Sequence, residues 1–225
     1  MATLSVSGSA THRHRAERGV VHLSVGFEGD DREKVVRDTI AVHSRLSEQA
    51  TAWRRQEAAT WWSARSVTVA VVTERETDRG EGGEATRASS TVRFRTRAAV
   101  DVRFSDFEAL ASWVGDVALE PGVDIEWVEW SLSHARRPEV EKAVRVAAIA
   151  DAVTRAGDYA EALGLGRPTL QSVFEPGLRP GAPGGGSPFG LARAAATFSS
   201  GGSTTFDLHP DDIEVSAEVS ADFVA

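Results

Sequence analysis

Three histidines near the N-terminus are the residues whose type and spacing first suggest chemistry, namely the binding of a metal ion. His12 and His14 are two residues apart, so they share one face of an extended strand. If the apolar residues of the first two predicted strands face the same core, His22 points the opposite way. The other histidines show none of the spacings typical of zinc sites, such as His-x3-His: His43, His134 and His209. We therefore interpret the histidines as structural or solvent-exposed residues and predict no metal site.

A regular series of arginines suggests a second kind of site, a basic surface for nucleic acid. The series occupies alternate positions on one face of a predicted strand: Arg93, Arg95, Arg97 and Arg103. A surface that stacks bases also needs aromatic residues between the arginines, and this face of the strand has none. The net charge of −8 argues against a dedicated nucleic-acid surface. We expect the arginines to pair with glutamates such as Glu74 and Glu76 on a neighbouring strand, which disfavours nucleic-acid binding.

Two glutamates beside tryptophans suggest a third kind of site, in which carboxyl groups act on a small molecule. Glu126 and Glu129 lie next to Trp127 and Trp130 in the sequence, and we expect the two tryptophans on opposite faces of one strand. Such acids could serve a pocket between the helices and the sheet. A small-molecule-binding protein or enzyme with a site of this kind is the main alternative function.

No motif in the sequence strengthens the enzyme alternative. There is no Gly-x-Ser-x-Gly nucleophile elbow, and Gly184–Ser187 lacks the Lys-Ser/Thr that follows a phosphate-binding loop. The paired aspartates are better explained as helix-cap and turn residues than as catalytic acids: Asp30-Asp31 and Asp211-Asp212. The chain has no cysteine, which excludes disulfides, thiolate metal sites and thiol nucleophiles. We predict no catalytic, metal-binding or cofactor-binding residue, no cofactor, and a protein that is not an enzyme.

The strand that carries the arginines is also the sharpest structural signal. Every second residue from Val92 to Phe104 is apolar or small, and this period of two predicts a long strand with one buried and one wet face. The same alternation returns at both ends of the chain, in Leu4–His14, Val21–Phe27 and Ile213–Phe223. We predict that the first two segments form a hairpin around Ala16–Gly19, and that the last segment rejoins the same sheet.

Caps and periodicity place the remaining elements. Helices are predicted from Asp30 or Asp31 to about Trp53–Glu57, from Asp106 to Val117, and from about Pro138 to Leu163. Further strands are predicted at Ser63–Glu74, Val123–Leu132 and Thr169–Phe174, the first of them buried on both faces for part of its length. One ring of Trp61-Trp62 is expected in the core and the other over a helix or an oligomer interface. The fold class is therefore α+β, with a long, mainly antiparallel sheet on which one long and two shorter helices pack.

Two segments are too rich in glycine, proline or charge to bury much surface. Thr77–Ala88 is predicted to be a mobile hairpin tip, and residues 176–205 a flexible Gly/Pro-rich loop. Because a strand pattern resumes after that loop, we predict a single domain over residues 1–225. The sequence shows no secretion signal and no run of 18 apolar residues. If Met1 is the natural start, this predicts a cytoplasmic protein that makes no membrane contact.

Several short segments, taken in order, carry a family resemblance. They are Val6-Ser7-Gly8-Ser9-Ala10, Val21-His22-Leu23-Ser24-Val25, Val100-Asp101-Val102-Arg103-Phe104-Ser105-Asp106, Val128-Glu129-Trp130-Ser131-Leu132-Ser133 and Ile213-Glu214-Val215-Ser216-Ala217-Glu218-Val219. With the order of elements, they resemble the SIMPL domain family over nearly the whole chain. The sequence departs from the family at the first turn, where Ala16-Glu17 replaces a usual Pro-Asp. It departs again before the fourth strand, where Arg93-Phe94 replaces Gly-Tyr.

The resemblance implies an α+β domain, assembly into rings or larger hollow oligomers in some members, and a loosely defined link to stress defence. It supplies no catalytic residues. Many bacterial members carry a secretion signal or lipoprotein anchor, which this sequence does not show, so envelope localisation is not carried over. Long strands also have free edges that a symmetric neighbour could cover. We therefore predict a non-enzymatic, self-assembling or partner-binding protein, with a homo-oligomer as the expected partner.

Overall fold

The structure, a computed structural model, describes residues 2–76, 89–180, 195–196 and 209–225. The chain divides into two compact units, each described here by itself. Unit 1 comprises residues 1–17, 131–194 and 211–225, and unit 2 comprises residues 18–130 and 195–210. The predicted tip at 77–88 and most of the predicted loop at 176–205 lie outside the described residues.

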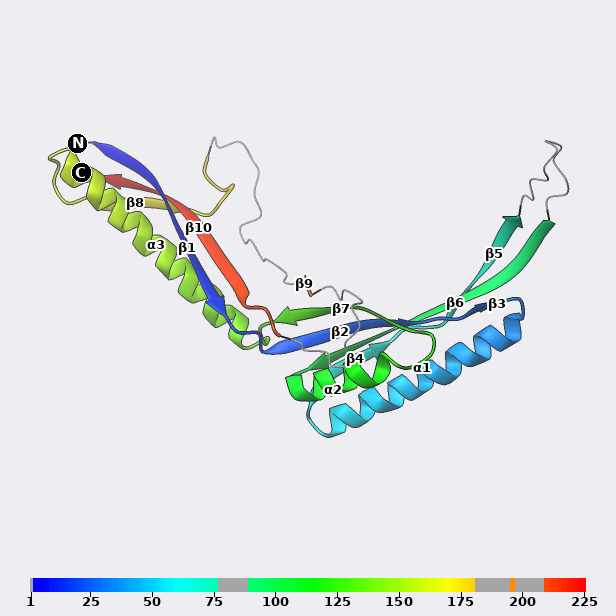
Figure 1. Cartoon of the computed structure of the whole chain (residues 1–225). Helices are drawn as coiled ribbons and strands as arrows, with labels where there is room; N and C mark the ends of the chain where they lie inside the picture. Colours follow the sequence, from blue (N-terminus) through cyan, green and yellow to red (C-terminus); the bar gives the residue numbers. More distant parts are fainter. Residues whose placement is uncertain (1, 77–88, 181–194, 197–208) are drawn as a thin grey trace. The chain divides into compact units, whose positions relative to one another are not determined.

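Unit 2 contains the longest strand of the chain at the centre of its sheet (Figure 1). Its elements are β2 (Arg18–Val25), β3 (Glu28–Gly29), α1 (Arg32–Arg55), β4 (Ala59–Ala64), β5 (Thr68–Glu76), β6 (Ser89–Phe104), α2 (Phe107–Val117), β7 (Val123–Ser131) and β9 (Ala195–Ala196). β6 pairs in antiparallel fashion with β2 and β3, and also with β4 and β5. β9 pairs with Val128 and Glu129 of β7, so this part of the predicted loop is a strand.

The predicted two-faced strand is confirmed in β6. Val100, Val102 and Phe104 are fully buried, whereas Arg95 and Arg97 are exposed. The Phe104 ring lies 6.3 Å from the Trp53 ring of α1 and 5.5 Å from the Trp113 ring of α2. The apolar face of β6 is therefore the one that both helices cover, and the arginines lie on the opposite face.

The helix starts follow the predicted capping residues. Asp31 accepts a hydrogen bond from the Lys34 backbone N–H at 3.0 Å and begins α1. Asp106 accepts from the backbone N–H groups of Glu108 and Ala109 at 2.9 and 3.1 Å and begins α2. These carboxylates satisfy N–H groups that have no partner within the helix.

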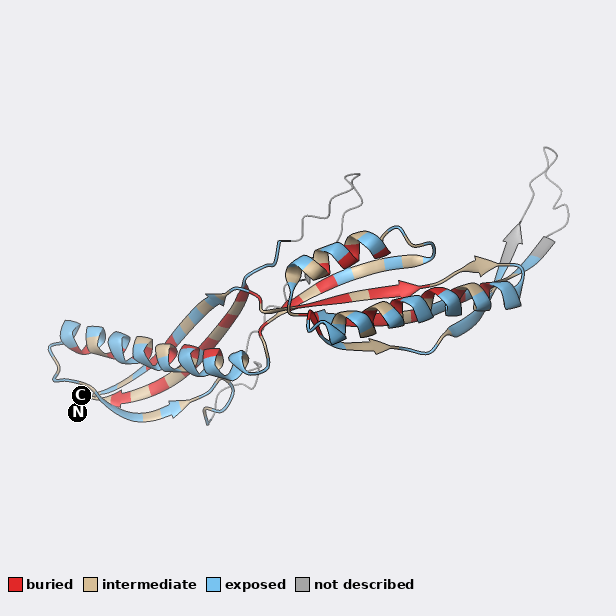
Figure 2. Ribbon diagram, turned by 90° about the horizontal axis from the view of Figure 1, so that it is seen from below, coloured by how far each residue is buried: buried red, intermediate tan, exposed pale blue. Residues whose placement is uncertain are grey.

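Unit 1 is a three-stranded antiparallel sheet with one helix on it. Its elements are β1 (Thr3–His14), α3 (Arg136–Ala162), β8 (Thr169–Phe174) and β10 (Ile213–Val224), in the strand order β1-β10-β8. Figure 2 shows buried residues alternating along β10 with less buried ones. α3 contributes a stripe of mostly small buried residues, four positions apart: Val140, Val144, Ala148, Ala152, Ala156 and Ala160.

The final strand joins a sheet with β1, but this sheet is separate from the one that holds β2, so the predicted N-terminal hairpin and the predicted single sheet are wrong. β1 pairs with β10 along its whole length, from Thr3↔Val224 to His14↔Ile213, whereas β2 belongs to the sheet of unit 2. Alternation shows that a segment is a strand but does not show which strand it pairs with. Residue size separates the two strands: Gly8 of β1 faces the alanines of α3, while Leu23 of β2 lies in a core of large side chains.

The α+β fold class is confirmed, but the described strands form two sheets in place of one. α3 has 27 residues, α1 has 24 and α2 has 11. The predicted two-sided burial in Ser63–Glu74 is wrong, because Val69 is 37% exposed and Val71 is 62% exposed. The reason is that β5, which forms a two-stranded arm with β6 (Figure 1), is an edge strand on which α1 and α2 make few contacts. The prediction of one domain over residues 1–225 stays a prediction.

The contact between β1 and α3 is close enough to exclude a side chain at position 8. A Cβ there would lie 2.6 Å from the Ala152 backbone nitrogen and closer still to the Ala148 carbonyl oxygen. We expect Gly8→Ala to lower the free energy of unfolding of unit 1 by about 1–3 kcal/mol, because helix and strand must separate. Urea unfolding followed by circular dichroism measures this loss.

Gly157 within α3 provides the matched control, since a Cβ there would meet no atom within 4 Å. Gly157→Ala should raise the free energy of unfolding by about 1 kcal/mol through helix propensity alone. Equal stabilisation by both substitutions would show that β1 and α3 are not in close contact.

Candidate functional site

In unit 2, the sheet face that points away from α1 and α2, here called the outer face, carries histidine, acidic, basic and aromatic side chains. It is formed by the side chains of β2 and β6 that alternate with the buried core residues. Residues of β4 and β7 whose side chains lie on the same side of the sheet complete it. Its central members are His22, Arg65, Asp101, Trp127 and Glu129, to which we refer as the His22 cluster. All five residues belong to unit 2.

His22 is held on two sides within this cluster. Its Nδ1 lies 2.8 Å from Asp101 Oδ1, and the two residues are direct cross-strand partners of β2 and β6. Its ring stacks on the Trp127 ring with centroids 4.6 Å apart and an angle of 26° between the planes. Asp101 also accepts a hydrogen bond from Arg65 at 3.1 Å. The imidazole is thus fixed in position and orientation by β6 and β7.

The second ring nitrogen of His22 decides what this cluster can do. Nε2 is shielded from solvent and lies 3.7 Å from Glu129 Oε2, which is too long for a hydrogen bond. A general base must reach the proton that it takes from a substrate. The enclosed Nε2 offers no such access, so the cluster acts as a polar connection between β6, β2 and β7.

The predicted arginine series lies on the outer face, but its described partners differ from the expected ones. Arg95 pairs with Glu28 at 2.6 Å, Arg93 pairs with the same carboxylate at 3.4 Å, and Arg97 pairs with Glu126. Arg103 lies over the Trp61 ring, 5.1 Å from its centroid. In the register of the arm, Glu74 and Glu76 stand opposite Thr91 and Ser89, and their side chains lie outside the described set. The face is therefore a mixture of both charges.

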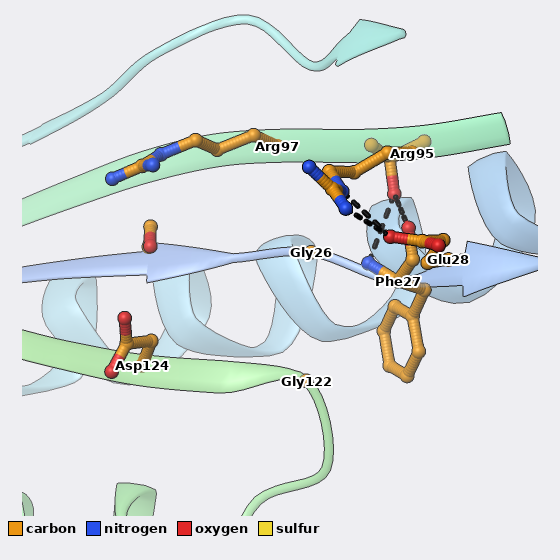
Figure 3. A pocket seen from close by; sticks show the side chains of 9 residues that line it. Gly26, Phe27, Glu28, Arg95, Arg97, Gly122 and Asp124 are labelled. Carbon is orange, nitrogen blue, oxygen red and sulfur yellow. Dashed lines mark hydrogen bonds and ion pairs between the residues drawn. The ribbon is translucent and has the colours of Figure 1, made fainter. Parts of the chain in front are cut away.

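A hollow of about 300 Å³ opens on the outer face beside the His22 cluster; we call it the Gly26 hollow. Figure 3 shows Arg95 and Arg97 on one side of the segment that carries Gly26, between β2 and β3, with Asp124 on the other side. Glu28 closes one end through its contact with Arg95. The remaining lining residues are Ser24, Phe27, Thr96 and Gly122.

Two glycines explain why the hollow exists. Gly26 takes the outer-face position between Ser24 and Glu28, and a Cβ there would collide with the Thr96 carbonyl oxygen. Gly122 has φ +78°, a conformation that favours glycine, and its carbonyl accepts a hydrogen bond from the Gly26 N–H at 2.8 Å. The floor is therefore backbone that no side chain covers.

The glutamates and tryptophans of the enzyme alternative are not brought together. Trp130 is buried against Phe107 of α2, with rings 5.1 Å apart, while Trp127 stacks on His22 of the outer face. The two tryptophans thus lie on opposite faces, as predicted. Glu126 contacts Arg97, and Glu129 lies near His22. The proposed position between helices and sheet is wrong for both acids, because that layer holds the apolar core.

The N-terminal histidines belong to different units. The rings of His12 and His14 lie 6.2 Å apart on β1 of unit 1, whereas His22 belongs to unit 2. Among the described residues, no group of three or more histidine and carboxylate side chains is arranged to hold a metal ion. Of the two neighbouring tryptophans, Trp61 is 38% exposed beneath Arg103, and Trp62 stands opposite the buried Val102.

Unit 1 carries one further polar cluster, centred on Asp222 of β10. Its carboxylate accepts hydrogen bonds from Ser5 at 2.6 Å, Arg179 at 2.5 Å and Ser172 at 3.3 Å. Arg179 also donates to Ser220 at 2.7 Å. The Ser5 hydroxyl, and then Arg179, hold the pKa of Asp222 below its ordinary value. This cluster fastens the segment after β8 to the sheet.

The two units define an α+β protein built from antiparallel sheets with helices on them, and no described helix is both long and apolar enough to cross a membrane. The chain belongs to the SIMPL family, a family described as proteins of unknown function (DUF541), whose model matches residues 4–223. No curated protein matches the chain.

Sequence reasoning missed the His22 cluster and the Gly26 hollow. Both depend on contacts between residues far apart in the chain, such as His22 with Asp101, which are 79 positions apart. The only local signal was that His22 and Asp101 each interrupt an apolar strand at a wet-face position.

The buried Asp101 carboxylate generates a stability prediction. Asp101→Asn removes the charge that both His22 and Arg65 contact, so we expect the free energy of unfolding to fall by about 1–3 kcal/mol. Asp124→Asn on the same face is the control, because Asp124 is exposed and should tolerate the change with little loss. Thermal unfolding of both variants measures the difference, and equal midpoints would contradict the assigned role of Asp101.

The lowered pKa of Asp222 predicts a pH dependence. A carboxyl group whose pKa is lower in the folded state stabilises the fold above its unfolded value, and this contribution is lost as pH falls through the folded value. Between pH 7 and pH 3, we expect the melting temperature of unit 1 to fall less in Asp222→Asn than in the parent chain. Calorimetry over that range tests this, and identical pH profiles would count against it.

Proposed function

We propose that this SIMPL protein acts by binding and self-assembly and not by catalysis. One observation carries the proposal: the β5–β6 arm exposes an apolar face. Val71 is 62% exposed, Val92 is 48% exposed and Val69 is 37% exposed. Isolated exposed apolar residues are common, but a contiguous set on one face is typical of an interaction site.

The register places these valines on one face. Val71 stands opposite Phe94, Val69 opposite Thr96, and Val92 opposite Thr73. Directly opposed residues of a strand pair share a face. The even-numbered residues of β6 are those that form the core under the helices, so the arm continues the core-facing side of the sheet. An apolar stripe therefore extends past the part of the sheet that the helices cover.

A second copy of this chain is the occupant that fits this stripe best. The described residues of the stripe carry no charge, although the chain has a net charge of −8 that would oppose close approach elsewhere. Two copies related by a two-fold axis could place the same valines against each other, as a self-complementary interface requires. A stable dimer buries at least about 1,200 Å² in total, so other surfaces must join the arm.

The free strand edges, which the sequence suggested as the contact, receive less support. β1 is an edge strand, but the Ser9 backbone N–H donates to Asp151 of α3 at 2.9 Å. A carboxylate placed there hinders the addition of another strand in the middle of β1. The face of the arm is therefore a better candidate for assembly than the edge of β1.

The non-enzymatic part of the proposal is supported by the enclosed Nε2 of His22. The acidic residues that lie among the arginines of the outer face, Glu28, Asp124 and Glu126, likewise disfavour nucleic-acid binding, because they would repel the phosphates. A role in stress defence and a cytoplasmic location stay predictions from the sequence and its family resemblance.

A charge on the arm separates assembly from folding. We expect the parent chain to sediment well above its monomer mass of 24.0 kDa, and Val71→Glu to shift it towards the monomer because a carboxylate cannot be buried in an apolar contact. Sedimentation velocity at micromolar concentration measures both masses.

Ala70→Glu is the matched control. Ala70 is the preceding exposed residue of the same strand, and it faces the other way, opposite Arg95. It should leave the mass unchanged. A monomeric parent chain would refute self-assembly, and equal effects of the two substitutions would refute the assignment of the apolar face.

A further inference from the structure

We propose that the Gly26 hollow binds a small zwitterion, a ligand such as a free α-amino acid that carries one anionic and one cationic group. This inference does not depend on self-assembly, because the hollow lies on the outer face and the exposed valines lie on the other face. It concerns unit 2 alone.

The positive side of the hollow is supplied by β6. Arg97 is 65% exposed at its side chain and contacts Glu126. A guanidinium group has five N–H donors, so Arg97 keeps donors for a further carboxylate. Arg95 directs its Nε and Nη2 at Glu28. It therefore has fewer donors left for a ligand carboxylate than Arg97 has.

The negative side is supplied by β7. Asp124 is exposed, lines the hollow and has no ion pair among the described residues. Figure 3 shows its carboxyl group across β2 from Arg97. An ammonium group entering the hollow would find this carboxylate available, and the charge-assisted hydrogen bond between them would be a strong one.

The separation of these charges selects the ligand class. β2 runs between β6 and β7, and neighbouring strands are about 4.8 Å apart, so the two charged sides are separated by roughly 10 Å at the backbone. Arg97 and Asp124 both line the hollow, so a small molecule bound there can contact both side chains. A polyanion such as a nucleotide would meet Glu28 and Asp124, and a simple cation would meet Arg97. Only a ligand with both charges is matched on both sides.

The volume and the floor agree with a small ligand. A hollow of about 300 Å³ stands at the lower end of the range for small-molecule sites. Its floor offers the Ser24 hydroxyl and the uncovered backbone around Gly26. A free amino acid fits these limits, and a long peptide does not fit within the hollow.

The test is calorimetric titration of the full chain at low ionic strength with individual L-amino acids and with two matched derivatives of each. The N-acetyl derivative lacks the cation, and the C-terminal amide lacks the anion. We expect saturable binding of at least one amino acid and roughly tenfold weaker binding of each derivative, since each loses one charged contact. Absence of saturable binding by every amino acid overturns the proposal, as does equal binding of either derivative.

Two exposed residues provide variants that test the orientation. Asp124→Asn should weaken the binding of the amino acid roughly tenfold and leave the binding of the N-acetyl derivative unchanged. Arg97→Gln should weaken the binding of the amino acid and leave the binding of the C-terminal amide unchanged. Arg103→Gln, on the same face but stacked on Trp61 outside the hollow, is the control and should change nothing. If the two hollow variants bind as the parent does while circular dichroism shows them folded, the ligand lies elsewhere and the assignment is wrong.

Discussion

The alternation of β6 is the constraint on which unit 2 depends. This strand pairs with β2 and β3 along one edge and with β4 and β5 along the other. Its even-numbered residues build the core with α1 and α2, and its odd-numbered residues build the outer face. If the pairing of β6 with a neighbouring strand shifted by one residue, the arginines of β6 would point into the core. The pairing must therefore be kept even where a neighbouring strand is interrupted.

The break between β2 and β3 shows how the pairing is kept. Gly19↔Phe104 and Glu28↔Arg95 belong to the same register, although Gly26 and Phe27 are not part of either strand. Across the break, the Phe27 N–H donates to the Thr96 side chain at 3.1 Å, and the Thr96 N–H donates to the Phe27 carbonyl at 2.9 Å. Thr96 Oγ1 also contacts Thr39 of α1 at 2.5 Å. One buried hydroxyl thus joins strand and helix where the ladder is interrupted, and the Gly26 hollow lies over this interruption.

The parts of the structure that sequence reasoning predicted are those that depend on neighbours in the chain. The two faces of β6, the caps Asp31 and Asp106, and the alternation of β10 all follow from patterns within one segment. The incorrect predictions concern pairing. β1 and β2 both alternate in the sequence, and that pattern does not show that β1 pairs with β10 while β2 pairs with β6. The His22 cluster combines residues of four separate segments, so it becomes visible only once the register of β2 against β6 is known.

The two faces of β6 also make assembly and ligand binding physically separable. In the arm, Val71 and Phe94 share the apolar face, while Ala70 and Arg95 share the outer face. A partner that covers the valines leaves the arginines in contact with solvent, so a filled interface need not close the Gly26 hollow. Coupling between the two functions would have to pass through the backbone at residues 94–97, where arm and hollow meet. Thr96 is fixed there by hydrogen bonds to Phe27 and Thr39, so this segment of β6 is rigidly held. That rigidity favours two independent surfaces on one strand over a switch between them.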